Sequence, residues 1–512
     1  MLTRLKVSGF KNLADVDVRF GAFTCIAGAN GVGKSNLFDA IRFLSDLADH
    51  TLIDAATSVR DEDSRAVEVR RNVGMTDITS LFQKYKDEVS GEIRSAEEMH
   101  FEAEMVIPKI GVDDYGQQAE ASATFLRYIL KLAYRKDENF SSLGGLEIVH
   151  EELIRVKGTN EKGTNPKSEL ISATSDIWYK SIVYGNKTVP LISTEEDSDR
   201  KLIKLHQDGK QGGSPVSRNA KTLPRTVLSS TNAAENQTAL LARNEMRSWR
   251  LLQLEPTSLR RPDSFTSPTE IGEDGSHLAA TLYHLAQTEA YKNGNGANAN
   301  QKASKIYGQI ASKLSELIDD VYSVKVDRDE QRQTLTLQVT DKNKTSYPAR
   351  ALSDGTLRFL ALAVIELDPT AQGVICLEEP ENGIHPARIP AILKLLEAIA
   401  TDTTMEVAPD NPLRQVIINT HSPAVVGQVK DEDLLVAEIK AGGVYFSCLP
   451  DTWRAKKCGT PTVSRGTLGA YLNPIGEVTE ITDLNNGDAK PRRRVIDRTD
   501  LQMLLPFPIV EK

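Results

Sequence analysis

The sequence contains little cysteine and no long apolar run. Its cysteines, Cys25, Cys376, Cys448 and Cys458, form no CxxC pair and no Cys/His spacing. This argues against a zinc site and against a disulfide framework, so we expect a reducing, cytoplasmic location. No stretch of eighteen or more apolar residues occurs, and the first residues alternate instead of forming an apolar signal block. We therefore expect neither a membrane span nor an export signal.

Positive charge is also in short supply. The formal net charge is −9, and 40% of the 512 residues are hydrophobic. Such a chain forms a globular protein of two or three domains. The acidic excess argues against a surface that coats nucleic acid and leaves open only a confined contact. The segment 200–225 carries seven Lys or Arg against one Asp. We expect a solvated loop there, with a surface that grips phosphates as the alternative.

One glycine-rich motif stands out. The stretch "GANGVGKS", residues 28–35, matches GxxxxGK[ST]. It follows the apolar run "FTCIAG" and opens an amphipathic stretch, which predicts a strand, a phosphate-binding loop and a helix. The glycines allow backbone N–H groups to wrap phosphates. Lys34 supplies charge to the β and γ oxygens, and the Ser35 hydroxyl is a ligand for Mg²⁺.

A cluster of acids forms the second motif. In "VICLEEPENGIHP", residues 374–386, an apolar run ends in Glu378, Glu379 and Glu381. Carboxylates this close repel one another unless a cation or a polarised water lies between them. Adjacent residues of an extended strand point to opposite sides, so we expect only one of the first two to face the γ-phosphate. We assign Glu378 to Mg²⁺ and Glu379 to the attacking water.

Two further segments surround these motifs. In "ALSDGTLRFLALAVIEL", residues 351–367, Ser353 and Gly355 lie at the expected start of an apolar helix, where free N–H groups bind an anion. In "QVIINTHSP", residues 415–423, a β-branched strand brings His421 to the same edge as the acids. An ordinary structural histidine is the alternative for His421.

In this order, the four motifs resemble those of ABC-type ATPases of the RecF/SMC-like and OLD-like group. The opening "LKVSGFKNLADVDVRF" is also similar, and the resemblance covers roughly 1–155 and 250–445. It implies an α/β, ABC-type P-loop ATPase head with a mixed β-sheet lobe, a helical signature lobe and an inserted region. The runs 100–107 and 124–134 are expected to complete an antiparallel sheet. Since no a/d heptads are sustained, we expect no long coiled-coil arms.

The same resemblance implies four ranges. These are the first part of the ATPase domain (1–155), an insertion and helical region (156–335), the second part of the ATPase domain (336–445) and a C-terminal extension (446–512). The extension ends in a basic run and an apolar strip. We interpret it as a candidate docking segment, with a packed terminal strand as the alternative.

Site roles are also implied by the resemblance. ATP and Mg²⁺ would be bound by the loop residues Gly28, Asn30, Gly31, Gly33, Lys34 and Ser35. Glu379 would be the general base and His421 the γ-phosphate sensor. Ser353 and Gly355 would act in trans within a homodimer that sandwiches ATP, with a higher oligomer left open. Gln83 is a candidate for the glutamine that links metal to lid. The metal-holding acid of the group is usually Asp, whereas Glu378 stands here.

Two functions fit these features, and a third stays open. The favoured one is the ATPase and sensor component of a bacterial anti-phage defence system, similar to the ATPases of Septu and PARIS. Because 446–512 lacks a Toprim-like carboxylate pattern, this would act with a separately encoded effector, expected to be a nuclease. The alternative is a RecF-like DNA-repair ATPase that clamps DNA in the ATP state. A nucleotide-binding scaffold with little turnover is the third.

Overall fold

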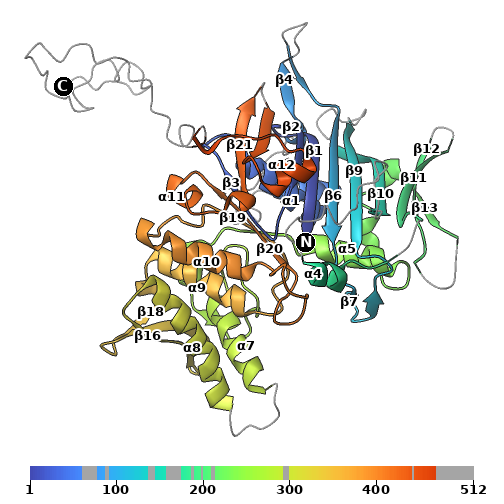
Figure 1. Ribbon diagram of the computed structural model, residues 1–512. Helices are drawn as coiled ribbons and strands as arrows, with labels where there is room; N and C mark the ends of the chain where they lie inside the picture. The colour runs from blue at the N-terminus through green and yellow to red at the C-terminus, as the bar shows by residue number, and fades with distance from the viewer. Residues whose placement is uncertain are drawn as a thin grey trace, which may run out of the picture. The chain divides into compact units, whose positions relative to one another are not determined.

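The computed structural model describes most of the chain, namely residues 1–59, 78–86, 92–135, 145–156, 175–185, 189–197, 200–208, 214–291, 299–440, 443–466 and 468. These residues form two large β-sheets with helices packed against them (Figure 1). The α/β prediction is confirmed. The described helices include none long and apolar enough to span a membrane. The predicted docking segment at the C-terminal end falls on 469–512, outside the described residues, and the four predicted ranges remain predictions.

The central sheet has six strands in the order β14-β19-β20-β3-β21-β22. Its first five strands run parallel and β22 is antiparallel. The bounds are β14 (Arg250–Leu252), β19 (Gly373–Glu378), β20 (Arg414–Thr420), β3 (Phe23–Ala27), β21 (Leu434–Lys440) and β22 (Gly443–Cys448). β3 and β20 are buried at every position, as expected for parallel strands covered on both faces. The carboxyl ends of β19, β20 and β3 therefore meet at one edge.

The second large sheet is antiparallel and has eight strands in the order β13-β12-β11-β10-β9-β6-β1-β2. Its bounds are β1 (Leu2–Phe10), β2 (Leu13–Arg19), β6 (Glu98–Val106), β9 (Phe125–Arg135), β10 (Gly145–Arg155), β11 (Ile192–Asp197), β12 (Arg200–Leu205) and β13 (Val216–Asn219). β6 and β9 pair along their lengths. The prediction that 100–107 and 124–134 complete an antiparallel sheet is confirmed.

The basic segment 200–225 corrects one expectation. Where it is described, it forms the strands β12 and β13 and a short 3₁₀ turn, so the predicted loop is wrong for these residues. Ile203 and Leu205 are buried, while Arg200 and Lys201 are exposed. Inward-facing apolar residues separated by one position are the signature of a strand with one buried face. The prediction of a loop relied on the number of charged residues and overlooked this alternation.

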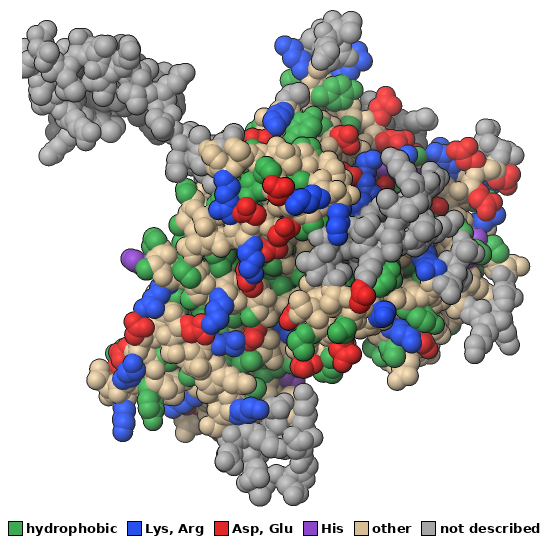
Figure 2. Space-filling model, in the orientation of Figure 1, with side chains coloured by type: hydrophobic (Ala, Val, Ile, Leu, Met, Phe, Trp, Pro, Cys, Tyr) green, Lys and Arg blue, Asp and Glu red, His purple; other side chains and the backbone are tan. Residues whose placement is uncertain are grey.

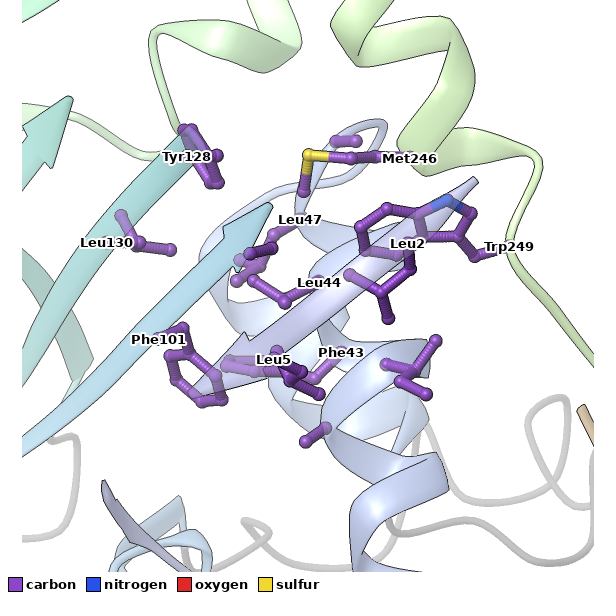
Figure 3. Packing of buried hydrophobic residues seen from close by; sticks show 14 of the residues in the cluster. Leu2, Leu5, Phe43, Leu44, Leu47, Phe101, Tyr128, Leu130, Met246 and Trp249 are labelled. Atoms are coloured by element: carbon purple, nitrogen blue, oxygen red, sulfur yellow. The ribbon is translucent and has the colours of Figure 1, made fainter. Parts of the chain in front are cut away.

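The helix α1 (Lys34–Leu47) joins the two sheets through one apolar core. The Phe43 ring lies 5.7 Å from that of Phe10 and 5.6 Å from that of Phe101. Figure 3 shows Leu44 and Leu47 of the same helix beside the strands of the antiparallel sheet, with Met246 and Trp249 nearby. This burial fixes α1, and so it fixes the loop at its N-terminus.

A helical lobe covers the other face of the central sheet (Figure 1). It contains α7 (Leu278–Tyr291), α8 (Ala299–Leu317), α9 (Asp354–Leu367) and α10 (Ile389–Ile399), with the small sheet of β15 (Asp263–Ser264), β16 (Val321–Asp329), β17 (Thr334–Asp341) and β18 (Ser346–Pro348). Val374 and Cys376 of β19 face the α1 core, whereas Ile375 and Leu377 face the helical lobe. This period of two fixes the register of the central strands.

Shorter elements complete the described chain. They are α2 (Leu52–Ser58), β4 (Lys84–Lys86), β5 (Ile93–Ser95), β7 (Ile110–Val112), β8 (Gln118–Glu120), α4 (Asp176–Ile182), α5 (Gln237–Arg247), α6 (Pro256–Leu259), α11 (Pro423–Val426) and α12 (Trp453–Cys458). On the face shown in Figure 2, Lys and Arg side chains alternate with Asp and Glu. The described residues of this face carry no broad area of positive charge.

Candidate nucleotide-binding site

The glycine-rich loop follows β3 and leads into α1. The Gly28 N–H donates to the Thr420 carbonyl at 3.2 Å, so the loop starts against the end of β20. Gly33 has a φ of 97°, in the left-handed region, and a Cβ at this position would lie 2.1 Å from Asn12 Nδ2. Only glycine fits there without displacing Asn12. Asn12 in turn accepts a hydrogen bond from Asn36 Nδ2 at 2.7 Å, which ties the β1–β2 turn to the loop.

Lys34 is held at the start of α1. That helix begins without a side-chain cap and without an acid in its first turn, as suits an anion-binding N-terminus. The side chain is buried, and Nζ donates to the carbonyls of Gly28 at 2.7 Å and Ala29 at 2.9 Å. Burial lowers the pKa of the Lys34 ammonium, and the carboxylates of Glu379, Glu378 and Glu381 oppose that shift. The Lys34 ammonium is therefore close enough to three acids at the sheet edge to interact with each electrostatically.

Glu379 departs from the extended geometry expected of it. β19 ends at Glu378, and Glu379 has a φ of 44°, so the expectation that both glutamates belong to one extended strand is wrong. The bend brings Glu379 Oε1 to 2.6 Å from His421 Nδ1. Asn382 Nδ2 donates to the other carboxylate oxygen at 2.8 Å. The structure thus brings together the predicted base and the predicted sensor.

Glu381 is the buried member of the acidic cluster. The residue is 8% exposed, and its Oε1 accepts a hydrogen bond from the Thr420 hydroxyl. Its Oε2 is also buried and has no hydrogen-bond partner among the described residues. Burial raises the pKa of the Glu381 carboxyl, against the hydrogen bond from Thr420. This carboxyl links residues 379–383, the acidic turn that follows β19, to the end of β20.

Ser353 and Gly355, the signature residues, lie in a turn at the start of α9, as predicted. Ser353 is the N-cap of this helix, and its Oγ accepts from the Thr356 N–H at 3.2 Å. A Cβ at Gly355 would lie 2.5 Å from the Gly383 carbonyl oxygen. Arg358, one turn further along α9, donates to the Asn382 carbonyl at 2.7 Å. The signature turn therefore packs on the acidic turn of its own chain, and its action in trans remains a prediction.

Two glutamines bear on the site, one predicted from the sequence and one found in the structure. The Gln83 N–H donates to the Gly9 carbonyl at 2.9 Å, which places its backbone beside β1. Its proposed link to metal remains a prediction. Gln253, directly after β14, lines a cleft of about 310 Å³ together with Glu378, Glu379 and Arg358. Sequence reasoning missed Gln253, because the pairing of β14 with β19 joins segments more than a hundred residues apart.

The donor set fits nucleotide-bound Mg²⁺. Within the described ranges, no group of three or more His, Cys, Asp or Glu could hold a metal ion by itself. Mg²⁺ in phosphate sites takes one or two protein oxygens and completes its shell with phosphate and water. Ser35 and Glu378 are exposed oxygen donors at the loop and at the end of β19, so they suit this role. Asn30, also exposed, lies in the same loop.

Comparisons with known proteins give a family match and several local similarities. Residues 23–95 and 130–427 match the family AAA_21, described as "AAA domain, putative AbiEii toxin, Type IV TA system". The DNA replication and repair protein RecF of Paenarthrobacter aurescens is 34% identical over 88 residues, 14% of this chain and 22% of RecF. RecF of Bacteroides thetaiotaomicron is 46% identical over 46 residues, 9% of this chain and 12% of RecF. The chain thus matches less than a quarter of the length of these curated relatives.

Among solved structures, an SMC head bound to the C-terminal winged-helix domain of ScpA aligns with a TM-score of 0.43 at 14% identity. The alignment covers 88% of this chain and 98% of that one. The SMC head domain of Thermotoga maritima gives a TM-score of 0.35 at 10% identity, over 88% of this chain and 98% of that one.

The buried Glu381 carboxyl generates a stability prediction. A carboxyl whose pKa is raised by folding favours the folded state while it is protonated, and this advantage is lost as the pH rises through its folded pKa. Glu381→Gln keeps an oxygen for Thr420 and removes the charge. We expect the variant to gain stability relative to wild type between pH 5 and pH 8, by roughly 1 kcal/mol or more.

The measurement is urea unfolding of nucleotide-free protein across this pH range. Glu97→Gln, at an exposed carboxyl, serves as the control and should show no pH-dependent difference from wild type. A Glu381→Gln difference that stays constant with pH would show that this carboxyl carries no unfavourable buried charge.

Proposed function

The chain belongs to the AAA_21 family, and on this premise we propose that it is an Mg²⁺-dependent ATPase of the ABC type. The observation that carries the proposal is the convergence at the edge of the central sheet. There, Lys34 of the glycine-rich loop lies among three carboxylates, and one of them, Glu379, pairs with His421. A phosphate-directed cation and a general base within one site are what nucleotide hydrolysis requires.

Nucleotide binding would begin at the loop. The N–H groups at the uncapped start of α1 would donate hydrogen bonds to the phosphate oxygens, and the helix dipole would favour the negative charge. Lys34 Nζ would exchange its two neutral carbonyl partners for anionic phosphate oxygens, which makes stronger, charge-assisted hydrogen bonds. Mg²⁺, held by Ser35 and by Glu378 through water, would neutralise phosphate charge when bound.

Hydrolysis would depend on Glu379. As general base, its carboxylate would accept the proton of the attacking water. His421 donates through Nδ1 to that carboxylate when this nitrogen carries the proton, which orients Glu379 and leaves the Nε2 side of the ring for the γ-phosphate. Asn382 restrains the second carboxylate oxygen. Together these contacts would pre-organise the base before substrate arrives.

Assembly would complete the site. In a head-to-tail homodimer, Ser353 and Gly355 of one subunit would close over ATP held by the Lys34 loop of the other. Two features support this: both residues start α9, where the dipole favours an anion, and Asp354 at that start is paired with Arg260. A higher oligomer would be compatible with the same contact.

The biological role we propose is that of a sensor or regulatory component in anti-phage defence, similar to the ATPases of Septu and PARIS. It would act in the cytoplasm with a separately encoded effector, in keeping with a family described by a toxin of a toxin–antitoxin system. The local matches to RecF favour a second candidate, a repair ATPase that clamps DNA in its ATP state. Co-purification with neighbouring gene products, with and without ATP and DNA, separates the two: a bound nuclease supports defence, and ATP-dependent DNA retention without one supports repair.

Mutation should distinguish the roles of Glu378 and Glu379. Glu379→Gln removes the base but keeps its shape, so turnover should fall by roughly 10²–10⁴ while ATP still binds. Glu378→Gln removes charge opposite the cation, so it should raise the Mg²⁺ concentration needed for binding and turnover. ATP turnover and Mg²⁺ titrations of both variants test this division. A Glu379→Gln variant with wild-type turnover, or two identical Mg²⁺ titrations, would contradict it.

The trans site should be separable from nucleotide binding. Ser353→Arg places a bulky cation at the start of α9, so it should abolish ATP-dependent pairing while ATP binding by the isolated subunit stays nearly intact. Mass measurement with and without ATP in the Glu379→Gln background reads out the pairing. Ser315→Arg, at an exposed position on α8, is the matched control. Normal pairing and hydrolysis by Ser353→Arg would exclude the ATP sandwich.

A further inference from the structure

Asn419 contacts both glutamates at the end of β19. It lies directly opposite Glu378 in the parallel pairing of β19 with β20 and is 2% exposed. Its side-chain Oδ1 accepts a hydrogen bond from the Glu379 N–H at 3.1 Å, and its Nδ2 donates to Glu378 Oε1 at 3.3 Å. One buried amide therefore bridges the two residues between which metal binding and base catalysis are divided.

The contact with Glu379 acts on its backbone. Glu379 is not a glycine but has a φ of 44°, a conformation that side chains rarely adopt without support. Its N–H also lies 3.1 Å from the Asn419 carbonyl, so Asn419 supplies both acceptors for this N–H. The bend they stabilise directs the carboxylate to His421, two residues beyond Asn419. Without Asn419 Oδ1, the Glu379 N–H would keep only the backbone acceptor, and the bend would be less stable.

The contact with Glu378 acts on its charge. An amide donor stabilises a carboxylate without bringing in a second negative charge. Asp at position 419 could still accept from the Glu379 N–H, but it would replace the donor to Glu378 with a repelling carboxylate. Asparagine is the side chain of this length that offers one acceptor and one donor, and the site uses both.

We propose that Asn419 is a positioning residue for ATP hydrolysis, whose amide holds Glu379 in the bent conformation of a general base and Glu378 at the metal side. The inference rests on the proposed ATPase function and adds a residue that neither the motifs nor the family match singles out. Asn419 acts through the two glutamates and does not touch the glycine-rich loop in the described contacts. Its loss should therefore affect turnover more than ATP binding.

The test compares Asn419→Ala and Asn419→Asp with wild type. Ala removes both contacts, so kcat should fall roughly ten- to hundredfold, with the KM for ATP changed less than about threefold. Asp keeps the acceptor for Glu379, so kcat at saturating Mg²⁺ should lie between those of Ala and wild type. Because Asp perturbs Glu378, the Mg²⁺ concentration for half-maximal rate should shift by about tenfold.

Gln415→Ala is the matched control. Gln415 is also a buried amide on β20, but it bonds the backbone of Leu2 and Gly21 at the opposite end of the strand. It should lower the unfolding temperature while kcat per folded molecule stays at the wild-type value. Thermal unfolding of all variants supplies the folded fraction.

The outcomes separate the inference from the proposed function. Wild-type kcat and an unshifted Mg²⁺ titration in both Asn419 variants would overturn the inference while the ATPase assignment stands. A loss of activity that follows the folded fraction, as a purely structural amide would give, would also overturn it. A wild-type protein that hydrolyses no ATP would remove both. Reduced kcat with retained ATP affinity in folded Asn419→Ala supports the inference.

Discussion

The parallel pairing of β20 with β3 on one side and β19 on the other is the constraint on which the site depends. It brings three chain segments to one edge, although they lie far apart in the sequence. The glycine-rich loop begins against Thr420, and the glutamates bend around Asn419. Alternate residues of these strands face two separate cores, so a one-residue slip would move every side chain into the other core and disrupt the packing of both. The packing that stabilises the fold therefore also sets the geometry of the proposed site.

A second consequence concerns the acidic turn, which connects the lobes. Gly383 leaves no room for a side chain on Gly355 at the start of α9, and Arg358 of the same helix holds the Asn382 carbonyl. Asn382 also holds Glu379. A displacement of α9 would therefore reach Glu379, the proposed general base, through a single turn. In the proposed homodimer, a partner subunit closing on Ser353 could influence hydrolysis in the same chain by this route.

The predictions that the structure supports came from patterns among residues that are close together in the sequence. The glycine-rich loop and its helix are encoded by adjacent residues, so residues 28–47 could be interpreted without knowledge of the fold. The strand at 200–205 was missed because its charged residues obscured two inward-facing apolar residues, and the strand at 216–219 was missed because none of its residues is buried. Asn419 and Gln253 could not be found from the sequence, since their importance comes from strand pairing with β19 across many residues. The left-handed backbone of Glu379 is likewise imposed by β20 and leaves no mark in "LEEPENG".

The central claim is that the loop around Lys34 binds the phosphates of ATP. Calorimetric titration of the protein with ATP, in the presence of Mg²⁺, tests it most directly. Lys34→Ala removes the cation that lies among the three carboxylates. We expect this variant to bind ATP at least about tenfold more weakly than wild type, a loss of roughly 1.4 kcal/mol or more. Lys325→Ala, at an exposed position on β16, should bind ATP like wild type. An unchanged ATP affinity in folded Lys34→Ala would contradict the assignment of this loop as the nucleotide site.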